Sequence, residues 1–500
     1  MKKSTLTSTV IRIVLLSFAL LSIALATEPS FKNPEIDSAQ SCFSNSHKAL
    51  LQDARKAVVT ISSNISISAY SKQGTWTGTG FIVDKQKGLI LTNSHVTGKA
   101  SLGEYTVTFH TGQEADAKLL YYDLWQDFAI LKVDRENIPE ETNEIIFSNE
   151  KPKLNESVFI IGNNEGQGFS IHKGTLSDLH SINGQMPQDS YIINLNSVGG
   201  SSGSPLLNKQ GKAIGLHYGG GDTFGISLKG EYVKDTLRTL RLGKKIKRQH
   251  IGILTKLYSL NKAAKFLKFP KEETNSYIKD FPDARNRAII VQSTIAGSPA
   301  ENELQAGDII WQVGNIKIGP SLYELDRLMN QATNEITLTI YRQGKKIIKK
   351  IKLYDVNAHK IKKMVEIKND VFFESDDVSS TKSGAPLSGL TIFNPYGEIE
   401  YIKHSKAIIP LTFGDYQLTS IENLIDATPK IIAKKHTTIE YKDLLPRNDY
   451  FGAWMISRDR LSQEITFTDF DRCFKILVYD PNKWEWHMNH KCIGSFDQSY

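Results

Sequence analysis

Short apolar runs separated by turn residues dominate the chain between residues 57 and 242. β-Branched residues are frequent in these runs, and Gly, Asn and Asp interrupt them, which is typical of the many short strands of a barrel or sandwich. We expect strands at 57–61, 80–83, 89–92, 105–110, 128–133, 158–162, 191–195 and 212–217. At 231–242 the apolar residues recur at a helical spacing, so a helix is expected to close this region.

Residues 250–355, the middle module, combine strands with helices. One helix is expected to open at 297–300, and another to span about 322–331. Strands are expected at 288–292, within 304–314, at 335–342 and at 345–353, the last two forming a hairpin that turns at Gln343 and Gly344. The stretch 264–287 is longer and more charged than the elements around it require.

Residues 356–500, the C-terminal module, contain enough apolar residues for a core of their own. We expect strands at 386–393, 398–402, 407–411, 431–441, 450–456 and 474–479, and a short helix at 420–427. The pattern predicts a mixed α/β module. The aromatic cluster at 484–488 suits either a core or an exposed binding patch, and we expect it in the core. This module gives no indication of its function.

The N-terminus has the composition of a secretory signal peptide. Lys2 and Lys3 precede an uncharged apolar run at 13–26, which ends on small residues at Ala24 and Ala26. The alternative is an uncleaved membrane anchor, but the run is shorter than the roughly 20 residues that span a bilayer. We therefore expect residues 1–26 to be removed, leaving 27–54 as an N-terminal segment. The protein is expected to be exported, to the periplasm or cell envelope, with secretion as the alternative.

The length, composition and net charge limit the number of domains and the class of protein. A length of 500 residues suggests roughly three domains of about 150 residues each. An apolar content of 40% with 23% charged residues excludes a disordered or fibrous chain. The net charge is +7, and a basic run lies at 244–249. We interpret it as a solvated linker; contact with anionic lipid is the alternative, and no nucleic-acid-binding signature accompanies it.

The cysteine pattern leaves two possibilities open. Cys473 and Cys492 are close in sequence and would pair in an oxidising compartment, with Cys42 left over. Three unpaired thiols are an equal alternative. Because no Cys or His residues have the spacing of a zinc site, we predict neither a metal nor a cofactor.

Three motifs within 55–243 carry the candidate chemistry. His95 follows an apolar strand, Asp127 begins a buried run, and Ser202 lies in the glycine-rich segment 198–205 (VGGSSGSP). An attacking serine must lose a proton, which a neutral imidazole can accept. A buried carboxylate orients that imidazole and stabilises its cation. The backbone amides of Gly200 and Ser202 are expected to form an oxyanion hole.

These motifs resemble those of the HtrA/DegP-like, trypsin-fold serine proteases. The matching segments, in family order and spacing, are GTGFIV at 78–83, TNSHV at 92–96, DFAIL at 127–131, IGN at 161–163, GSSGSP at 200–205 and GKAIG at 211–215. The resemblance implies a mainly β fold, with a chymotrypsin-like double barrel at 55–243. It also implies an ATP-independent endopeptidase with His95, Asp127 and Ser202 as its triad.

The middle module resembles a PDZ domain. GSPA at 297–300 and AGDII at 306–310 are the matching segments. The resemblance implies that Ile251, Gly252 and Ile253 form a loop that binds peptide carboxylates, beside which a peptide adds as a strand. It further implies polypeptide substrates that are misfolded or extended, and a homo-oligomer built on trimers. A degenerate second PDZ-like module is one possibility for 356–500.

The nucleophile segment departs from the usual HtrA pattern. It looks more like that of the bacterial glutamyl endopeptidases, in which a histidine after the nucleophile and a hydroxyl before it bind an acidic P1 side chain. His217 and Ser197 occupy those positions. We hypothesise a preference for Glu or Asp at P1. The alternative is that His217 only lines the pocket and that P1 is small and aliphatic.

Two other functions remain compatible with the sequence. A chaperone or scaffold could keep the fold and bind peptides without cutting them. A secreted effector protease could act on one particular target protein.

Overall fold

The computed structural model of the protein describes residues 45–164, 167–184, 186–392, 407–449, 452–457, 460–483 and 485–493. The barrels and the modules that follow them belong to one compact unit, which begins at Ala49. The predicted signal peptide, Cys42 and the strand expected at 398–402 lie outside the described residues. In the part of the chain that the structure describes, no helix is long and apolar enough to cross a membrane.

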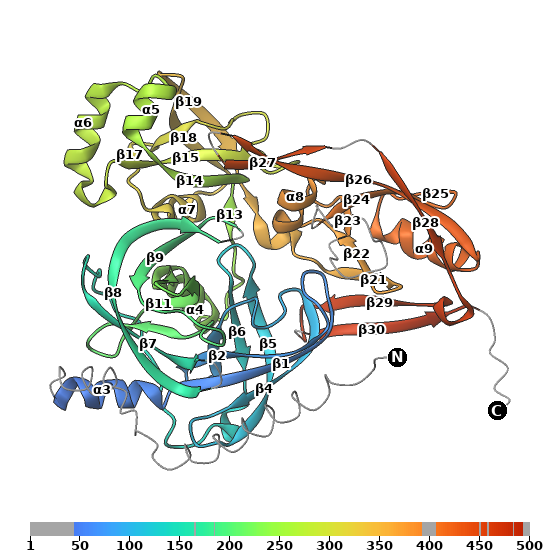
Figure 1. The fold of residues 1–500 in the computed structure, drawn as a ribbon, viewed down its shortest axis with the longest axis horizontal. Coiled ribbons are helices and arrows are strands. Elements are labelled where there is room, and N and C mark those ends of the chain that lie inside the picture. The colour runs from blue at the N-terminus through green and yellow to red at the C-terminus, as the bar shows by residue number, and fades with distance from the viewer. Residues whose placement is uncertain are drawn as a thin grey trace, which may run out of the picture. The chain divides into compact units, whose positions relative to one another are not determined.

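Two closed six-stranded barrels follow the helix α3 (Asn45–Arg55), and they lie side by side in Figure 1. The first consists of β1 (Val58–Ser68), β2 (Gly74–Asp84), β3 (Leu89–Thr92), β4 (Ser101–Thr108), β5 (Glu114–Asp123) and β6 (Phe128–Lys132). The second consists of β7 (Ser157–Asn164), β8 (Gln167–Asn183), β9 (Gln188–Asn194), β10 (Pro205–Leu207), β11 (Ala213–Gly221) and β12 (Phe224–Lys229). The predicted double barrel and mainly β fold are confirmed.

The barrels form because alternate residues of their strands face inward. In β1, for example, Val59 and Ile61 point into an apolar core with Ile82 and Val107. The predicted helix is α4 (Gly230–Arg241), whose buried residues include Val233 and Leu237. A short 3₁₀ helix, η1 (Arg135–Asn137), lies between the barrels in sequence.

The middle module is a sheet of order β14-β15-β16-β18-β19 covered by helices. Its elements are β13 (Gln249–His250), β14 (Ile253–Ser259), α5 (Leu260–Phe266), α6 (Lys271–Asp280), η2 (Pro282–Ala284), β15 (Arg287–Thr294), β16 (Ile309–Val313), β17 (Ile316–Lys317), α7 (Leu322–Gln331), β18 (Glu335–Arg342), β19 (Lys345–Lys352) and β20 (Tyr354–Asp355). Strand β14 forms one edge of this sheet. The long charged stretch supplies α6 and part of an apolar cluster in which Tyr277 packs on Trp311.

The helix expected to open at 297–300 is absent. These residues form successive turns, in which the amide of Ser298 bonds to the carbonyl of Ile295 at 3.1 Å and that of Glu301 to Ser298 at 3.1 Å. Gly297 has a φ of 75°, which does not continue a right-handed helix.

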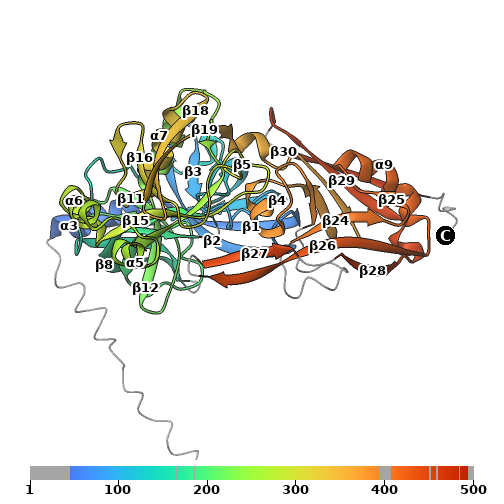
Figure 2. The same ribbon diagram turned by 90° about the horizontal axis from the view of Figure 1, so that it is seen from above.

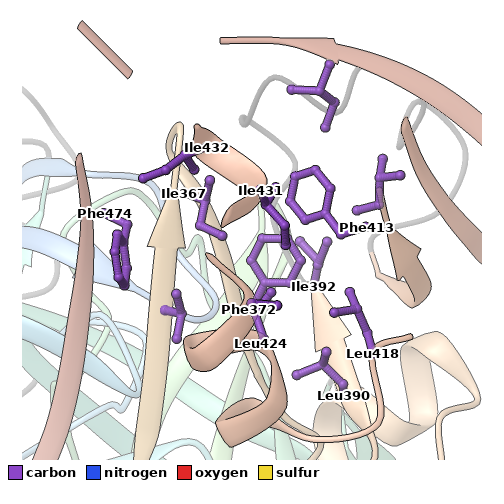
Figure 3. Close-up of a cluster of buried hydrophobic side chains, with 14 of the residues drawn as sticks. Ile367, Phe372, Leu390, Ile392, Phe413, Leu418, Leu424, Ile431, Ile432 and Phe474 are labelled. Carbon is purple, nitrogen blue, oxygen red and sulfur yellow. The ribbon is translucent and has the colours of Figure 1, made fainter. Parts of the chain in front are cut away.

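The C-terminal module is a long antiparallel sheet of order β27-β26-β24-β23-β22-β21-β29-β30. Its elements are η3 (Val356–His359), β21 (Lys363–Ile367), β22 (Asp370–Glu374), α8 (Asp377–Ser383), β23 (Leu390–Ile392), β24 (Ile408–Phe413), β25 (Tyr416–Gln417), α9 (Ile421–Ile432), β26 (His436–Asp449), β27 (Gly452–Ser457), β28 (Leu461–Thr466), η4 (Asp469–Asp471), β29 (Cys473–Asp480) and β30 (Glu485–Cys492). Helix α9 lies against this sheet (Figure 2), and Leu424, Ile431 and Ile432 join Phe372 and Phe413 in the core drawn in Figure 3.

Two strand predictions in this module are wrong in their bounds. Helix α9 continues to Ile432, because Ile431 and Ile432 are both buried in the core, so the strand expected at 431–441 begins only at His436. The strand expected at 386–393 shrinks to Leu390–Ile392. Its first residues turn instead, with the amide of Gly389 bonded to the carbonyl of Pro386 at 2.8 Å.

Strands β29 and β30 bring Cys473 and Cys492 opposite each other in a disulfide, with Cα atoms 4.1 Å apart. Among the described residues, Cys473, Cys492 and His490 are the one group of three potential metal ligands, and the disulfide takes up two of them. Strand β30 is an edge strand in which Met488 is 50% exposed. The expected core position is therefore wrong for Met488, because no further strand covers this edge within the described residues.

Candidate active site

His95 and Asp127 meet at one end of the first barrel. Strands β3 and β6 pair with Thr92 opposite Ala129, so the turn after β3 and the residue before β6 lie together. His95 Nδ1 lies 2.7 Å from Asp127 Oδ2. Asp127 has a φ of 49°, a conformation that non-glycine residues adopt rarely and that is common at functional sites. The two predicted residues therefore form the expected pair.

The carboxylate of Asp127 is held on its other oxygen as well. Oδ1 accepts hydrogen bonds from Ser94 Oγ at 2.8 Å and from the His95 amide at 3.0 Å. Burial acts to raise the pKa of Asp127, but the nearby His95, its hydrogen bond, Lys99 and Ser94 outweigh it and lower the pKa below its ordinary value. An ionised Asp127 holds the imidazole with Nδ1 facing the carboxylate, so Nε2 is left to exchange a proton.

Ser202 lies in the nucleophile loop, residues 198–204, between β9 and β10. Gly200 and Gly203 have φ angles of 90° and 89°, which favour glycine. A Cβ atom on Gly203 would lie 1.8 Å from the carbonyl oxygen of Thr79, so no side chain fits there. The hydroxyl of Ser202 points to the carbonyl of Tyr218 at 3.5 Å, and the described residues include no hydrogen bond between Ser202 and His95.

The two amides predicted for the oxyanion hole differ from the amide of the next residue, Gly203, in their backbone hydrogen bonds. Within the described residues, the amides of Gly200 and Ser202 make no backbone hydrogen bond, whereas the amide of Gly203 bonds to the carbonyl of His217 at 2.9 Å. A Cβ atom on Gly200 would lie 2.5 Å from the carbonyl oxygen of Asn163. Glycine is therefore required where the loop approaches the second barrel. Free amides beside a serine are what stabilisation of a developing oxyanion needs.

Comparison with known proteins identifies this part of the chain. Residues 78–216 match the family model described as a trypsin-like peptidase domain. The chain contains a trypsin-like peptidase domain. This match contains all three triad candidates and strands of both barrels, and we call residues 55–243, which include both barrels in full, the peptidase domain.

Its homologues are HtrA-type serine proteases. The pro-apoptotic serine protease NMA111 of Debaryomyces hansenii is 24% identical over 430 residues, which cover 83% of this chain and 43% of that protein. The protein of the same name from Candida glabrata is 25% identical over 418 residues, covering 81% and 41%. The chain thus spans less than half the length of these relatives.

Solved structures are similar over part of the chain. The serine endoprotease from Yersinia pestis is 23% identical, with a TM-score of 0.42, and covers 63% of this chain and 99% of that one. The HtrA-type protease AlgW with a decapeptide is 19% identical, with a TM-score of 0.44, and covers 61% and 98%.

Ser197 and His217, the candidates for P1 recognition, are in contact in the peptidase domain. Ser197 Oγ lies 2.8 Å from His217 Nε2. On the other side of the ring, Ser227 Oγ lies 3.3 Å from His217 Nδ1. Burial, with a smaller effect of His95, lowers the pKa of His217 to about 4, so the ring is neutral at neutral pH. The sequence did not reveal Ser227, because it lies on the separate strand β12.

Ile251 and Gly252 connect β13 to β14, and Ile253 is the first residue of β14. Gly252 has a φ of 86°, its amide bonds to His250 Nδ1 at 2.9 Å, and its carbonyl accepts from Ser298 Oγ at 3.1 Å. Ile251 and Ile253 are buried in the core of the middle module. Ile182, from β8 of the peptidase domain, packs against the same core. Carboxylate binding by this loop stays a prediction.

Proposed function

We propose that the chain is an exported serine endopeptidase whose triad consists of His95, Asp127 and Ser202. The observation that carries the proposal is the His95–Asp127 pair, with 2.7 Å between Nδ1 and Oδ2, in a domain that also contains the glycine-rich nucleophile loop. A histidine oriented by an ionised carboxylate is the general base that a serine nucleophile needs. Export rests on the signal-like N-terminus alone.

The chemistry follows from these positions. Ser202 Oγ attacks the scissile carbonyl carbon while its proton passes to His95 Nε2, and Asp127 stabilises the imidazolium. The amides of Gly200 and Ser202 bind the oxyanion of the tetrahedral intermediate. His95 then protonates the leaving amine, and water hydrolyses the acyl-enzyme by the same route.

His217 and the two hydroxyls beside it support a preference for an acidic P1 residue. Ser197 and Ser227 contact the two ring nitrogens of buried His217 at 2.8 and 3.3 Å, so the ring lies between two hydroxyl groups. A P1 carboxylate placed there raises the pKa of His217, since an opposite charge favours the protonated ring. Substrate binding would then be coupled to proton uptake by His217. A small aliphatic P1 residue is the alternative specificity.

The middle module supports a role in substrate selection. Strand β14 forms one edge of its sheet, and a peptide could extend that edge as an added strand beside 251–253. Extended or misfolded polypeptides suit such a site, because it recognises backbone and a free C-terminus rather than a folded surface. By its resemblance to the HtrA family, we propose that the chain acts as a homo-oligomer.

The experiment that tests this function is degradation of an unfolded protein such as casein by the mature chain and by its Ser202→Ala variant. Mass spectrometry of the products gives the P1 residues in the same experiment. We expect cleavage by the wild type only. Suppression of aggregation by both proteins without any cleavage would favour the chaperone instead. Cleavage of one folded target, with casein left intact, would favour the effector protease.

A further inference from the structure

The hydroxyl of Thr79 connects three parts of the active site. Thr79 lies in β2 of the first barrel and is fully buried. Its Oγ1 donates a hydrogen bond to the carbonyl oxygen of Gly200 at 2.8 Å and accepts one from the amide of Asn163 at 2.9 Å. Gly200 belongs to the nucleophile loop, and Asn163 to β7 of the second barrel. One hydroxyl therefore ties the nucleophile loop to both barrels.

The backbone of Thr79 contacts the same loop. Its amide donates to the carbonyl of Ser202 at 2.8 Å. Its own carbonyl accepts a hydrogen bond from Thr92 Oγ1 at 2.7 Å, which fixes the position of Thr79 in the barrel. The two residues whose amides form the proposed oxyanion hole, Gly200 and Ser202, thus both have their carbonyl groups bound to Thr79.

Gly200 needs such a restraint. It has no side chain, and its φ of 90° lies in a region where glycine has much conformational freedom. A larger residue cannot supply the restraint, because a Cβ atom there would lie 2.5 Å from the Asn163 carbonyl oxygen. Holding the Gly200 carbonyl limits rotation of the peptide unit between Gly200 and Ser201, which lies in the chain between the amide of Gly200 and that of Ser202. The amides then need little reorganisation when the oxyanion forms.

We propose that the Thr79 hydroxyl is the positioning group of the oxyanion hole. This inference rests on the proposed peptidase function. Thr79 touches neither the substrate nor the reacting atoms, and it acts through the carbonyl of Gly200. Its loss therefore weakens stabilisation of the tetrahedral intermediate, while contacts with the bound substrate stay as they are.

The test compares Thr79→Val, which keeps the shape and removes the hydroxyl, with Thr79→Ser, which keeps the hydroxyl. Loss of one direct oxyanion donor lowers kcat about 10²- to 10³-fold, so loosening both donors should lower kcat about 10- to 100-fold. KM should change less than about threefold, because a contact made only in the transition state affects kcat alone. Thr79→Ser should recover kcat to within about threefold of the wild type.

A second measurement separates positioning from a structural role. A peptide boronic acid forms a tetrahedral adduct with Ser202, and its affinity should fall in Thr79→Val in parallel with kcat. Binding of a substrate peptide to Ser202→Ala should be the same with and without Thr79→Val. Thr142→Val is the matched control, because Thr142 is equally buried and its hydroxyl has no hydrogen-bond partner among the described residues. Thr142→Val should leave kcat unchanged.

The outcomes distinguish this inference from the proposed function. A wild type that neither cleaves casein nor reacts with a fluorophosphonate would overturn the function itself. A reactive wild type with an equally active Thr79→Val would overturn only the positioning role. If Thr79→Val does not fold, the same kinetic and boronic acid measurements are made on Thr79→Ala. Failure of both to fold, beside an active Thr79→Ser, would also overturn the inference, because the hydroxyl would then maintain the fold and not the loop.

Discussion

Ser94 Oγ donates a hydrogen bond to Asp127 Oδ1 at 2.8 Å, on the carboxylate whose Oδ2 lies 2.7 Å from His95 Nδ1. We predict that Ser94→Ala lowers kcat/KM about 10- to 100-fold, because a hydrogen bond to a charged group contributes about 1.5–3 kcal/mol. Asp127→Asn should cost about 10⁴-fold, since it favours the wrong tautomer of His95. Steady-state kinetics with a peptide substrate measures both.

The control for Ser94→Ala is Ser63→Ala. Ser63 is as buried as Ser94 and lies in the same barrel, but its hydroxyl has no hydrogen-bond partner among the described residues. If the two alanine variants retain the same activity, Ser94 has no part in orienting Asp127.

His217 carries the prediction on specificity. If His217 binds an acidic P1 residue, the wild type should cleave Glu-P1 peptides at least about tenfold faster than Val-P1 peptides. The reason is that a valine side chain leaves the buried imidazole of His217 without a hydrogen-bond partner from the substrate. His217→Ala should lose the Glu-P1 activity and keep the Val-P1 activity. Because His217 has a pKa of about 4 without substrate and an acidic P1 raises it, the Glu preference should weaken as the pH rises.

Peptide libraries with varied P1 residues, assayed between pH 5 and 9, measure this preference. Equal kcat/KM values for Glu and Val peptides, in the wild type and in His217→Ala alike, would leave His217 as a residue that only lines the pocket.

The sequence was sufficient to predict the parts of the site that depend on local motifs. His95, Asp127 and Ser202 each follow or precede a strand in a recognisable segment, and the pairing of β3 with β6 brings His95 and Asp127 together. Thr79 lies in such a motif, but its hydroxyl contacts Gly200 across 121 positions of sequence. No local pattern encodes a hydrogen bond of that separation.

Contacts between modules could not be predicted from the sequence either. Ser321 precedes α7, as an N-cap residue would, but its side chain does not cap the helix. Asp189 of β9 caps the helix instead, accepting hydrogen bonds from the Tyr323 amide at 3.0 Å and from Ser321 Oγ at 2.7 Å.

Strand β8 was not predicted, because its polar residues give no regular alternation of apolar and polar positions. The middle module and the neighbouring strands stabilise it in the fold.

Ile182 of β8 leads to a prediction about peptide binding by the middle module. It is half-buried and packs against the core that contains Ile251 and Ile253. If the Ile182 side chain occupies the place that the apolar C-terminal residue of a peptide would take, the two compete for the same core. Replacing Ile182 with a polar residue then removes roughly 1 kcal/mol of apolar contact that opposes peptide binding. Ile182→Ser should therefore bind a peptide with a free apolar C-terminus about fivefold more tightly than the wild type.

Fluorescence anisotropy with a labelled peptide measures this affinity. Ile171→Ser is the matched control, because Ile171 lies on the same strand with 36% of its surface exposed. The same peptide with a C-terminal amide shows whether the carboxylate is recognised. An affinity that is identical in Ile182→Ser and the wild type would exclude competition by Ile182.

Asp326 of α7 gives the final prediction, a pH dependence of stability. It is buried between the modules, where it accepts a hydrogen bond from Tyr232 at 2.9 Å and faces Arg248, Gln126 and His250. Burial raises the pKa of Asp326 to about 7, although Arg248 and Tyr232 oppose this. Between the ordinary carboxyl pKa of about 3.9 and pH 7, the folded chain thus holds a proton that the unfolded chain lacks.

The stability that Asp326 contributes is therefore fully present at low pH and is lost as the pH rises toward 7. Thermal unfolding of the wild type and of Asp326→Asn, compared between pH 5 and 8, should show a smaller decrease in Tm for the variant. Some dependence remains in the variant, because burial also raises the pKa of Asp377 to about 7. Asp283→Asn, at an exposed position of the same module, should follow the wild type. An Asp326→Asn curve parallel to that of the wild type would mean that the folded chain already ionises Asp326 at low pH, with Arg248 as its counter-ion.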